Sequence, residues 1–418
     1  MTKVLASAEA FGFGPASKLI TVSAELRRRG IHIDVAAADA ALTFARANAG
    51  LFDEIIAVNG ADELAKIDAA GYDGAVSVMD PFLTIWARSN GLPCTYVDSL
   101  FWFWNWGTGR EDQLQQTAAE VTAQPSALDA IRALERVPMH DSQYIAHHLS
   151  AVSCVQGATR VDGRCREIRG LGRVDVVNAV IDLTYQRESS PATWLATTSG
   201  VVNPLLPKDC AIAWIRTVAR LLEEAADRSG STAPITLAGN GELLAVAPDI
   251  ASARIKPEPM SHDQILIAMN GAIGCLTPPG LTTMMECAAY GVPFILLPEQ
   301  HYGHISNFGA VTGCGTPEIF PHGLVDPDGS AREPADVLSE TLQVAENLRR
   351  HFENKTEVWT RMVEGIADGM RAARAGRERL RAAQEAAMRE FVGAFTGAGQ
   401  VADVIESLLP EHADPARH

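Results

Sequence analysis

The segment from residue 270 to residue 300 constrains the fold more than any other part of this chain. It contains two short apolar runs, residues 272–276 and 292–297, which have the length and composition of buried strands. Between them stands the turn Thr277-Pro278-Pro279-Gly280, followed by an amphipathic pattern over residues 281–290 that ends at Gly291. Strand, tight turn, helix and strand form a βαβ unit, so this segment predicts two strands of one sheet joined by a helix.

The turn in this unit suits a negatively charged ligand. Thr282 and Thr283 put hydroxyls and backbone N–H groups at the start of a helix, where phosphate is favoured. Glu286 lies six residues after Gly280, about two turns into the helix at ~3.6 residues per turn. A carboxylate there could accept hydrogen bonds from the sugar hydroxyls of a nucleotide, whereas most helix glutamates face solvent. The pattern alone leaves both interpretations open.

The rest of the chain repeats this alternation. Strands are predicted at residues 4–7, 31–37, 55–58, 74–78, 94–97, 151–155, 174–180, 194–198, 235–238 and 254–256, and helices at 16–29, 61–70, 81–89, 211–226 and 261–269. This order indicates an α/β protein whose mostly parallel sheets carry helices on both faces. Because 418 residues exceed one ordinary core, two doubly wound domains are expected, 1–185 and 191–370, with C-terminal helices over 371–418.

Charge and cysteine content argue against several classes of partner. The net charge of −16 disfavours binding to nucleic acid or to an anionic membrane. The seven cysteines are scattered and form no C-x-x-C pair, so neither a disulfide framework nor a zinc site is indicated. No apolar run is long enough for a membrane span, and the N-terminus lacks a signal region. We therefore expect a reduced, cytoplasmic protein. Its oligomeric state is left open by the sequence, with a homodimer as one candidate.

A second ligand-binding turn is predicted near the N-terminus. Glu9 follows the first strand by two residues, and the turn that comes next contains Gly12, Phe13 and Gly14 before Pro15 opens a helix. A glycine-rich turn between a first strand and a first helix indicates close approach of a ligand to the backbone. The third glycine of a dinucleotide fingerprint is missing, so this motif alone does not identify the ligand.

These features resemble the GT-B glycosyltransferases, in the branch that contains the UDP-glycosyltransferases and the lipid II N-acetylglucosaminyltransferase of cell-wall synthesis. The resemblance covers most of the chain and is most specific between residues 261 and 310. It implies that the turn holds the diphosphate of a UDP-sugar and that Glu286 holds the ribose hydroxyls. The donor-binding residues that it implies are Gly200, Lys256, Met260, Gly280, Leu281, Thr282, Thr283, Glu286, Gln300 and His304. Lys256 and Met260 belong to the loop that would seat the uracil.

The chain also departs from this family at positions that matter for catalysis. Pro278 stands where many relatives carry a histidine before the diphosphate turn. His304 aligns with a family glutamine near the donor sugar. Phe13 occupies the neighbourhood of the histidine that natural-product members use as catalytic base. The catalytic base therefore cannot be transferred from the family.

A narrower resemblance, to the cytosylglucuronic acid synthases of nucleoside antibiotic pathways, rests on the turn 11–15 and the run 96–104. Those enzymes join glucuronic acid from UDP-glucuronate to N1 of cytosine. The acceptor-binding residues would be Gly12, Phe13, Gly14, Phe101, Trp102 and Trp104, with Arg110 as partner of the sugar carboxylate. A planar base suits an aromatic pocket. The alternatives for the aromatic run 101–106 are a core plug and an exposed patch for a partner.

The reaction expected of such an enzyme is inverting displacement of UDP through an oxocarbenium-like state. Asp98, which ends a strand directly before the aromatic run, is the favoured base, with Glu9, Asp80 and His140 as further candidates. The alternative for Asp98 is a turn or helix cap. The adjacent pair His147-His148 is predicted to be solvent-exposed rather than metal-binding, because neighbouring helix residues point in different directions.

No metal and no cofactor besides the UDP-sugar co-substrate is expected. The sequence Asp326-Pro327-Asp328-Gly329 is a strong turn signal, which we favour over a metal-binding D-x-D. Other functions stay open at this stage. They are a UDP-sugar-dependent O-glycosyltransferase acting on another natural product, a UDP-sugar 2-epimerase, and a non-catalytic sugar-nucleotide-binding partner protein.

Overall fold

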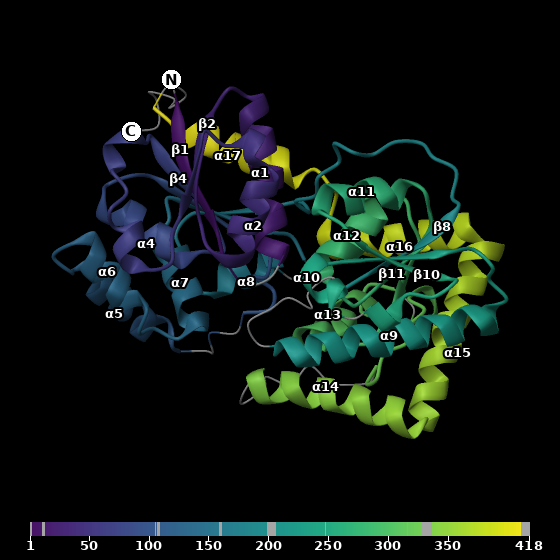
Figure 1. The fold of residues 1–418 in the computed structure, drawn as a ribbon. Coiled ribbons are helices and arrows are strands. Elements are labelled where there is room, and N and C mark those ends of the chain that lie inside the picture. Colours follow the sequence, from purple (N-terminus) through teal and green to yellow (C-terminus); the bar gives the residue numbers. More distant parts are fainter. Residues whose placement is uncertain are drawn as a thin grey trace. The chain divides into compact units, whose positions relative to one another are not determined.

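Two parallel sheets organise the computed structural model, which describes residues 2–10, 13–104, 106, 109–158, 161–198, 206–246, 248–315, 317–327 and 337–410. Contacts along the chain divide it into two units. The first contains Met1–Asp182 and Val392–His418, and the second is Leu183–Phe391. Figure 1 shows the first unit mainly in purple and blue, and the second in teal and green. Each unit is described by itself.

The first unit is built on a sheet whose seven described strands are all parallel, in the order β3-β2-β1-β4-β5-β6-β7. The strands are β1 (Lys3–Ala8), β2 (His32–Ala37), β3 (Glu54–Ala57), β4 (Gly74–Val78), β5 (Cys94–Asp98), β6 (Val152–Gln156) and β7 (Val174–Val177). The central strands are buried along their whole length, which explains why they read as unbroken apolar runs rather than as alternating patterns.

Helices cover both faces of this sheet, as the alternation in the sequence predicts. They are α1 (Phe13–Arg28), α2 (Asp39–Ala47), α3 (Ala61–Leu64), α4 (Pro81–Ser89), α5 (Glu111–Thr122), α6 (Ala127–Leu134), α7 (Met139–Leu149), α8 (Val161–Glu167) and α17 (Gly397–Leu408). Val4 of β1 packs in one core with α1, α2 and α17, whereas Leu5 packs in a second core with α4 and α6. Successive side chains of a strand point to opposite faces, so one strand serves both cores.

The second unit repeats the plan with described strands in the order β10-β9-β8-β11-β12, all parallel. They are β8 (Thr193–Thr197), β9 (Ile235–Gly239), β10 (Ile255–Pro259), β11 (Ala272–Thr277) and β12 (Phe294–Leu296). Pro257 and Pro259 lie in β10, an edge strand, where a missing N–H donor is tolerated. The expected βαβ unit is present as β11, α12 (Leu281–Ala289) and β12.

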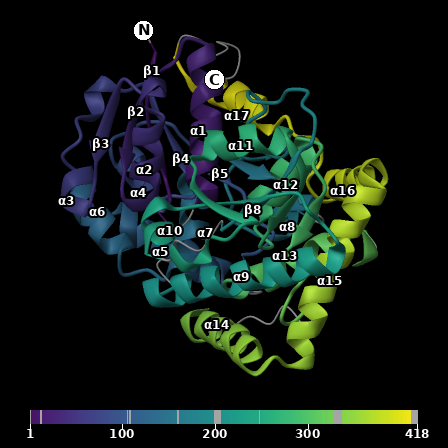
Figure 2. The same cartoon turned by 45° about the vertical axis from the view of Figure 1, so that its right-hand side comes forward.

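The remaining helices of the second unit complete its two layers. They are α9 (Lys208–Ser229), α10 (Gly241–Ala245), α11 (His262–Asn270), α13 (Tyr302–Thr312), α14 (Val337–Asn354), α15 (Glu357–Ala375) and α16 (Arg377–Val392). Helix α9 packs against α14 and α15 on one side of the sheet, and Figure 2 shows α11 and α12 on the other side. Trp214 of α9 and Trp359 of α15 belong to the core between these helices and the sheet.

The C-terminal helices are divided between the units, a different arrangement from the separate segment 371–418 considered above. Helix α17 buries Val401 and Ile405 in a core of the first unit. Arg29, directly after α1, holds it through Asp403 at 2.6 Å and Glu406 at 2.5 Å. Helix α16 belongs to the second unit, where the side chain of Gln384 bonds the backbone N–H and carbonyl of Phe294 in β12. The apolar face of each helix, rather than its place in the sequence, decides which sheet it covers.

Each sheet has a point where the chain reverses its direction of winding. In the first unit the chain runs from β1 outward to β2 and β3, and then returns to the other side of β1 with β4. In the second unit the same reversal lies between β8 and β11. Ligands of doubly wound sheets bind at the carboxyl ends of the strands beside such a reversal. Within each unit, a ligand is therefore expected beside the strand ends at this reversal, which are those of β1 and β4 in the first unit and of β8 and β11 in the second.

Candidate functional site

The predicted diphosphate turn lies at the reversal point of the second unit. Gly280 is the residue before α12 and has extended backbone geometry, and its N–H donates to the carbonyl of Pro278 at 2.6 Å. Asn307 of α13 donates to the carbonyl of Pro279 at 2.9 Å, which ties a second helix to the turn. Below it, the hydroxyls of Thr197 and Thr277 bond at 2.9 Å and join the ends of β8 and β11. These hydrogen bonds hold the turn in place at the N-terminus of α12, where the positive end of the helix dipole favours an anion.

Glu286 is not a solvent-exposed helix glutamate. It is buried, and its Oε1 lies 2.7 Å from Nε2 of His262 at the start of α11. Sequence reasoning missed His262 as a partner, although the signal was present: Ser261 and Gln264 form a capping box that fixes where α11 begins. In the first turn of α12, Leu281 and Thr283 are buried and Thr282 is half-buried.

The loop expected to seat the uracil lies at the end of β10. The N–H of Met260 donates to the carbonyl of Gly239 at 3.4 Å, which places this residue at the carboxyl end of β9. Lys256 is further from that end, its side chain is 72% exposed, and its ammonium pairs with Glu258 at 2.9 Å. Gly200, the remaining donor candidate in this unit, lies outside the described residues.

A compact polar cluster stands beside the turn, at the N-terminus of α13. Gln300 is buried and donates from Nε2 to the carbonyl of Thr198 at 3.4 Å, while its Oε1 has no partner among the described residues. Nδ1 of His304 accepts from the backbone N–H of Gln300 at 3.1 Å, so the proton of the neutral ring sits on Nε2. The ring of His301 lies 3.8 Å from that of His304. Burial lowers the pKa of both, to about 4 for His301. His301 was not predicted.

In the first unit, two carboxyl groups lie at the reversal point. Glu9 follows β1, and its N–H donates to the carbonyl of Val78 at the end of β4. Asp80 caps α4, accepting from Ser7 at 2.6 Å and from the N–H of Phe82 at 3.0 Å. Burial raises the pKa of Asp80. Burial, and then the charge of Asp80, raise the pKa of Glu9 from 4.5 to about 8. A half-buried carboxyl with a pKa in this range is suited to exchanging protons near neutral pH.

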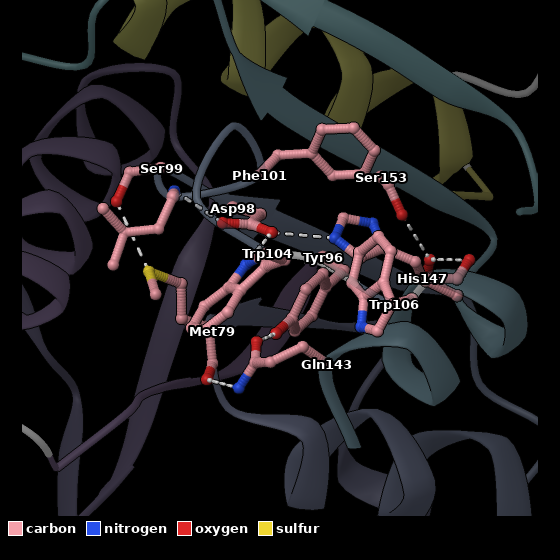
Figure 3. Close-up of polar contacts among 12 residues, drawn as sticks. Met79, Tyr96, Asp98, Ser99, Phe101, Trp104, Trp106, Gln143, His147 and Ser153 are labelled. Atoms are coloured by element: carbon pink, nitrogen blue, oxygen red, sulfur yellow. Dashed lines mark hydrogen bonds and ion pairs between the residues drawn. The ribbon is translucent and has the colours of Figure 1, made fainter. Parts of the chain in front are cut away.

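Asp98, the favoured base, is completely buried with both oxygens engaged (Figure 3). Oδ2 accepts from Nε1 of Trp104 at 2.8 Å and lies 2.8 Å from Nε2 of His147, and Oδ1 accepts from the N–H of Leu100 at 2.7 Å. The expectation that His147 and His148 are both exposed is wrong. His147 is fully buried, and His148 is half-buried with Nδ1 against the carbonyl of Gly170. Spacing on a helix shows that two neighbours diverge but does not show which one faces the core.

The aromatic run is largely a core plug in the first unit. Phe101, Trp104 and Trp106 are buried in a cluster with Tyr144 and Val155, whereas Trp102 is half-buried. These observations favour packing for Phe101 and Trp104. Trp102 and its half-buried neighbour Phe103 are left as the rings of the run with accessible surface.

The remaining predicted site residues of the first unit lie either near the aromatic run 101–106 or in the predicted turn, residues 11–15. Arg110 precedes α5, is 45% exposed, and pairs with Asp141 at 2.8 Å. The ring of His140 is stacked on Phe103. Gly14 lies in the first turn of α1, whereas Gly12 and the side chain of Phe13 lie outside the described residues.

No group of three or more metal-ligating side chains is found in the part of the chain that the structure describes. In the sequence 326–329, the N–H of Asp326 donates to Glu299, and Asp328 and Gly329 lie outside the described residues. Of the helices described, none combines the length and the apolar character that crossing a membrane requires.

No protein-family model matches this sequence, and no curated protein matches it either. Solved structures do resemble the fold. A structure of LpCGTa in complex with UDP has a TM-score of 0.51 at 11% identity, over 98% of this chain and 99% of that chain. Phytolacca americana UGT2, complexed with UDP-2fluoro-glucose and pterostilbene, has a TM-score of 0.50 at 13% identity, over 97% of this chain and 99% of that chain. The predicted architecture is confirmed: the chain has the GT-B fold, with two doubly wound sheets and a helical C-terminal segment.

Proposed function

We propose that this chain of GT-B fold is an inverting glycosyltransferase that uses a UDP-sugar donor. The observation that carries the proposal is the N-terminus of α12, which stands at the reversal point between β8 and β11 with Glu286 buried two turns behind it. A helix N-terminus behind a tight turn suits a diphosphate, and a recessed carboxylate can accept hydrogen bonds from ribose hydroxyls. The two structures of similar fold contain UDP and UDP-2fluoro-glucose.

In the proposed complex, the turn 278–280 and the first turn of α12 receive the diphosphate. Glu286 accepts hydrogen bonds from the ribose hydroxyls, and His262 keeps its carboxylate oriented. Gln300, whose Oε1 is a buried acceptor, and His304 meet the hydroxyls of the sugar. When the bond between the anomeric carbon and the diphosphate breaks, its electron pair leaves with UDP. The dipole of α12 stabilises that growing negative charge.

For the acceptor, we propose N1 of cytosine and, for the sugar, glucuronic acid from UDP-glucuronate. The half-buried rings Trp102 and Phe103 suit a planar base, because bases stack on aromatic faces. Glu9 would take the N1 proton as N1 attacks the anomeric carbon, with inversion at that carbon. A heteroaromatic N–H needs a weaker base than an alcohol does. Arg110, which shares its charge with Asp141, is the proposed partner of the sugar carboxylate.

The test is to incubate the protein with UDP-glucuronate, UDP-glucose or UDP-N-acetylglucosamine, each with and without cytosine. UDP and the glycosylated base are measured by mass spectrometry. We expect cytosine-dependent release of UDP from UDP-glucuronate together with a new nucleoside. Transfer only to an alcohol or phenol acceptor would replace the cytosine assignment with O-glycosylation. UDP binding by calorimetry without turnover in an acceptor panel would indicate a non-catalytic binder, and no binding would refute the proposal.

A further inference from the structure

A buried polar network lies inside the aromatic cluster of the first unit, and the reaction proposed above does not use it. Asp98 and His147 are both completely buried and lie 2.8 Å apart (Figure 3). The rings of Tyr96, Phe101 and Trp106 surround the imidazole of His147, each nearly perpendicular to it, with centroids 4.9 to 5.9 Å away. Burying a carboxylate and an imidazole in such a place is costly unless both are paired.

The hydrogen bonds of Asp98 show what this pair holds in place. Leu100 and Trp104 donate to the carboxylate from the segment that follows β5, and His147 lies against it from α7. Because the carboxylate can only accept, the proton between the two groups belongs on Nε2 of His147. Nδ1 of His147 has no hydrogen-bond partner among the described residues. The imidazole therefore acts on Asp98 through one nitrogen alone.

Arg164 of α8 holds the same segment from another direction. Its guanidinium donates to the carbonyl of Phe101 at 3.0 Å, to that of Trp102 at 2.7 Å, and also to that of Trp104. It lies 5.5 Å from the ring centroid of Phe101. The negative charge of Asp98 favours the charged form of this guanidinium. A planar fork that satisfies three carbonyls is a property of arginine that lysine cannot reproduce.

The segment held in this way lies at the proposed acceptor side. It follows β5, which is the neighbour of β4 in the sheet, so it starts from the same carboxyl edge as Glu9 and Asp80. We propose that His147 and Arg164 are positioning residues that fix residues 100–104, so that the half-buried rings of Trp102 and Phe103 are set for a planar acceptor. The acceptor part of this proposal rests on the proposed function, whereas the fixing of the segment does not.

Matched substitutions test the proposal. His147→Phe removes the donor to Asp98 at similar volume, whereas His147→Gln keeps an N–H that can reach it. Arg164→Lys keeps the charge and loses the fork, and Arg166→Lys on the same helix changes an exposed side chain as control. Hydrogen exchange of a peptide covering residues 99–104 reports the fixing of the segment. Michaelis constants for cytosine and calorimetry with UDP report the acceptor and donor sides.

We expect faster exchange of this peptide in His147→Phe and Arg164→Lys, and exchange like that of the unchanged protein in the other two variants. The Michaelis constant for cytosine should rise about tenfold or more in the same two variants with UDP affinity unchanged, since a hydrogen bond to a charged group is lost. Unchanged exchange in Arg164→Lys and His147→Phe would refute the fixing role. Faster exchange with an unchanged Michaelis constant would refute the acceptor role. A protein without transfer activity refutes the proposed function instead, and hydrogen exchange still decides whether the segment is fixed.

Discussion

The pH dependence of catalysis should follow the ionisation of Glu9. Its pKa is raised from 4.5 to about 8, first by burial and then by the charge of Asp80. A general base works only as the carboxylate, so kcat should rise with pH and level off above about 8. For one ionisation with this pKa, the carboxylate fraction is roughly one tenth at pH 7 and roughly one hundredth at pH 6. The variant Glu9→Gln, which cannot take up a proton, should lose most of this activity at every pH.

The same ionisation should make the folded state less stable as pH rises, whereas it makes kcat increase. The folded state holds a proton on Glu9 that the unfolded state releases above pH 4.5, so Glu9 reduces the stability of the folded state as pH rises from about 4.5 to about 8. One pKa unit corresponds to about 1.36 kcal/mol, which sets an upper limit of about 5 kcal/mol for a half-buried group that solvent partly screens. Glu9→Gln should therefore match the unchanged protein at pH 4.5 and be more stable at pH 9.

Steady-state kinetics from pH 5.5 to 9.5 and urea unfolding at pH 4.5 and 9 test both effects. Glu63→Gln, which changes an exposed carboxyl of the same unit, is the control. A kcat that does not depend on pH, or a Glu9→Gln variant with more than half of the activity at pH 8, would refute the assignment of Glu9 as base. Equal stability of the two proteins at pH 9 would refute the perturbed ionisation itself.

Three further predictions concern neighbouring parts of the structure. Asp80→Asn removes the charge that helps to raise the pKa of Glu9 while keeping a capping oxygen, so the midpoint of the kcat profile should move to lower pH. Glu286→Ala should weaken UDP binding by about 1–3 kcal/mol in calorimetry, the effect of an orphaned polar contact, and unchanged affinity would remove Glu286 from the site. Gln384→Ala leaves buried backbone groups of β12 without their partner and should lower the free energy of unfolding by about 2–4 kcal/mol. Glu378→Ala, at an exposed position of the same helix, should change it little, and similar urea midpoints for the two variants would contradict the role of Gln384.

The fold could be predicted from the sequence because its signals are local. A short stretch of sequence contains the whole pattern: the apolar run 272–276, the turn 277–280 and the helix pattern that follows. The structure has β11 and α12 at these positions. Alternation of strands and helices then implies parallel sheets, since parallel strands need a crossover between them. The destination of the C-terminal helices could not be read in this way. The pairing of Arg29 with Asp403 and Glu406 joins residues far apart in the chain, and no local pattern encodes it.

The residues of the candidate site also fall into those that a local sequence pattern indicates and those that depend on contacts between elements. Gly280 and Glu286 could be proposed from the sequence because a turn and a helix fix their spacing. His262 and Arg164 could not be singled out, because each contacts a partner on another element, and His301 was overlooked although its partner His304 lies only three residues along the chain. Capping by Ser261 fixes the start of α11, but only the packing of α11 beside α12 brings His262 to Glu286. Side chains that act across elements need the tertiary structure.

Asp98 and Glu9 show how two carboxyl groups at one sheet edge take different roles from their surroundings. Asp98 accepts from three donors, and because two of them share Oδ2, a proton on that oxygen would cost one of the two its acceptor. Glu9 is a half-buried carboxyl that burial and Asp80 have made a better proton acceptor. Asp98→Asn tests the distinction, because His147 can move its proton to Nδ1, which has no partner among the described residues, and accept from the new amide through Nε2, while Trp104 loses the acceptor that it shares with His147.

We expect Asp98→Asn to fold and to lose affinity for the acceptor while its kcat profile keeps a midpoint at about pH 8, since Glu9 sets that midpoint. Steady-state kinetics over the same pH range measure both quantities, and UDP calorimetry controls for the donor side. If Asp98 were the base, its amide would abolish turnover and leave no titration to follow. Loss of the midpoint in Asp98→Asn with a normal profile in Glu9→Gln would reverse the two assignments.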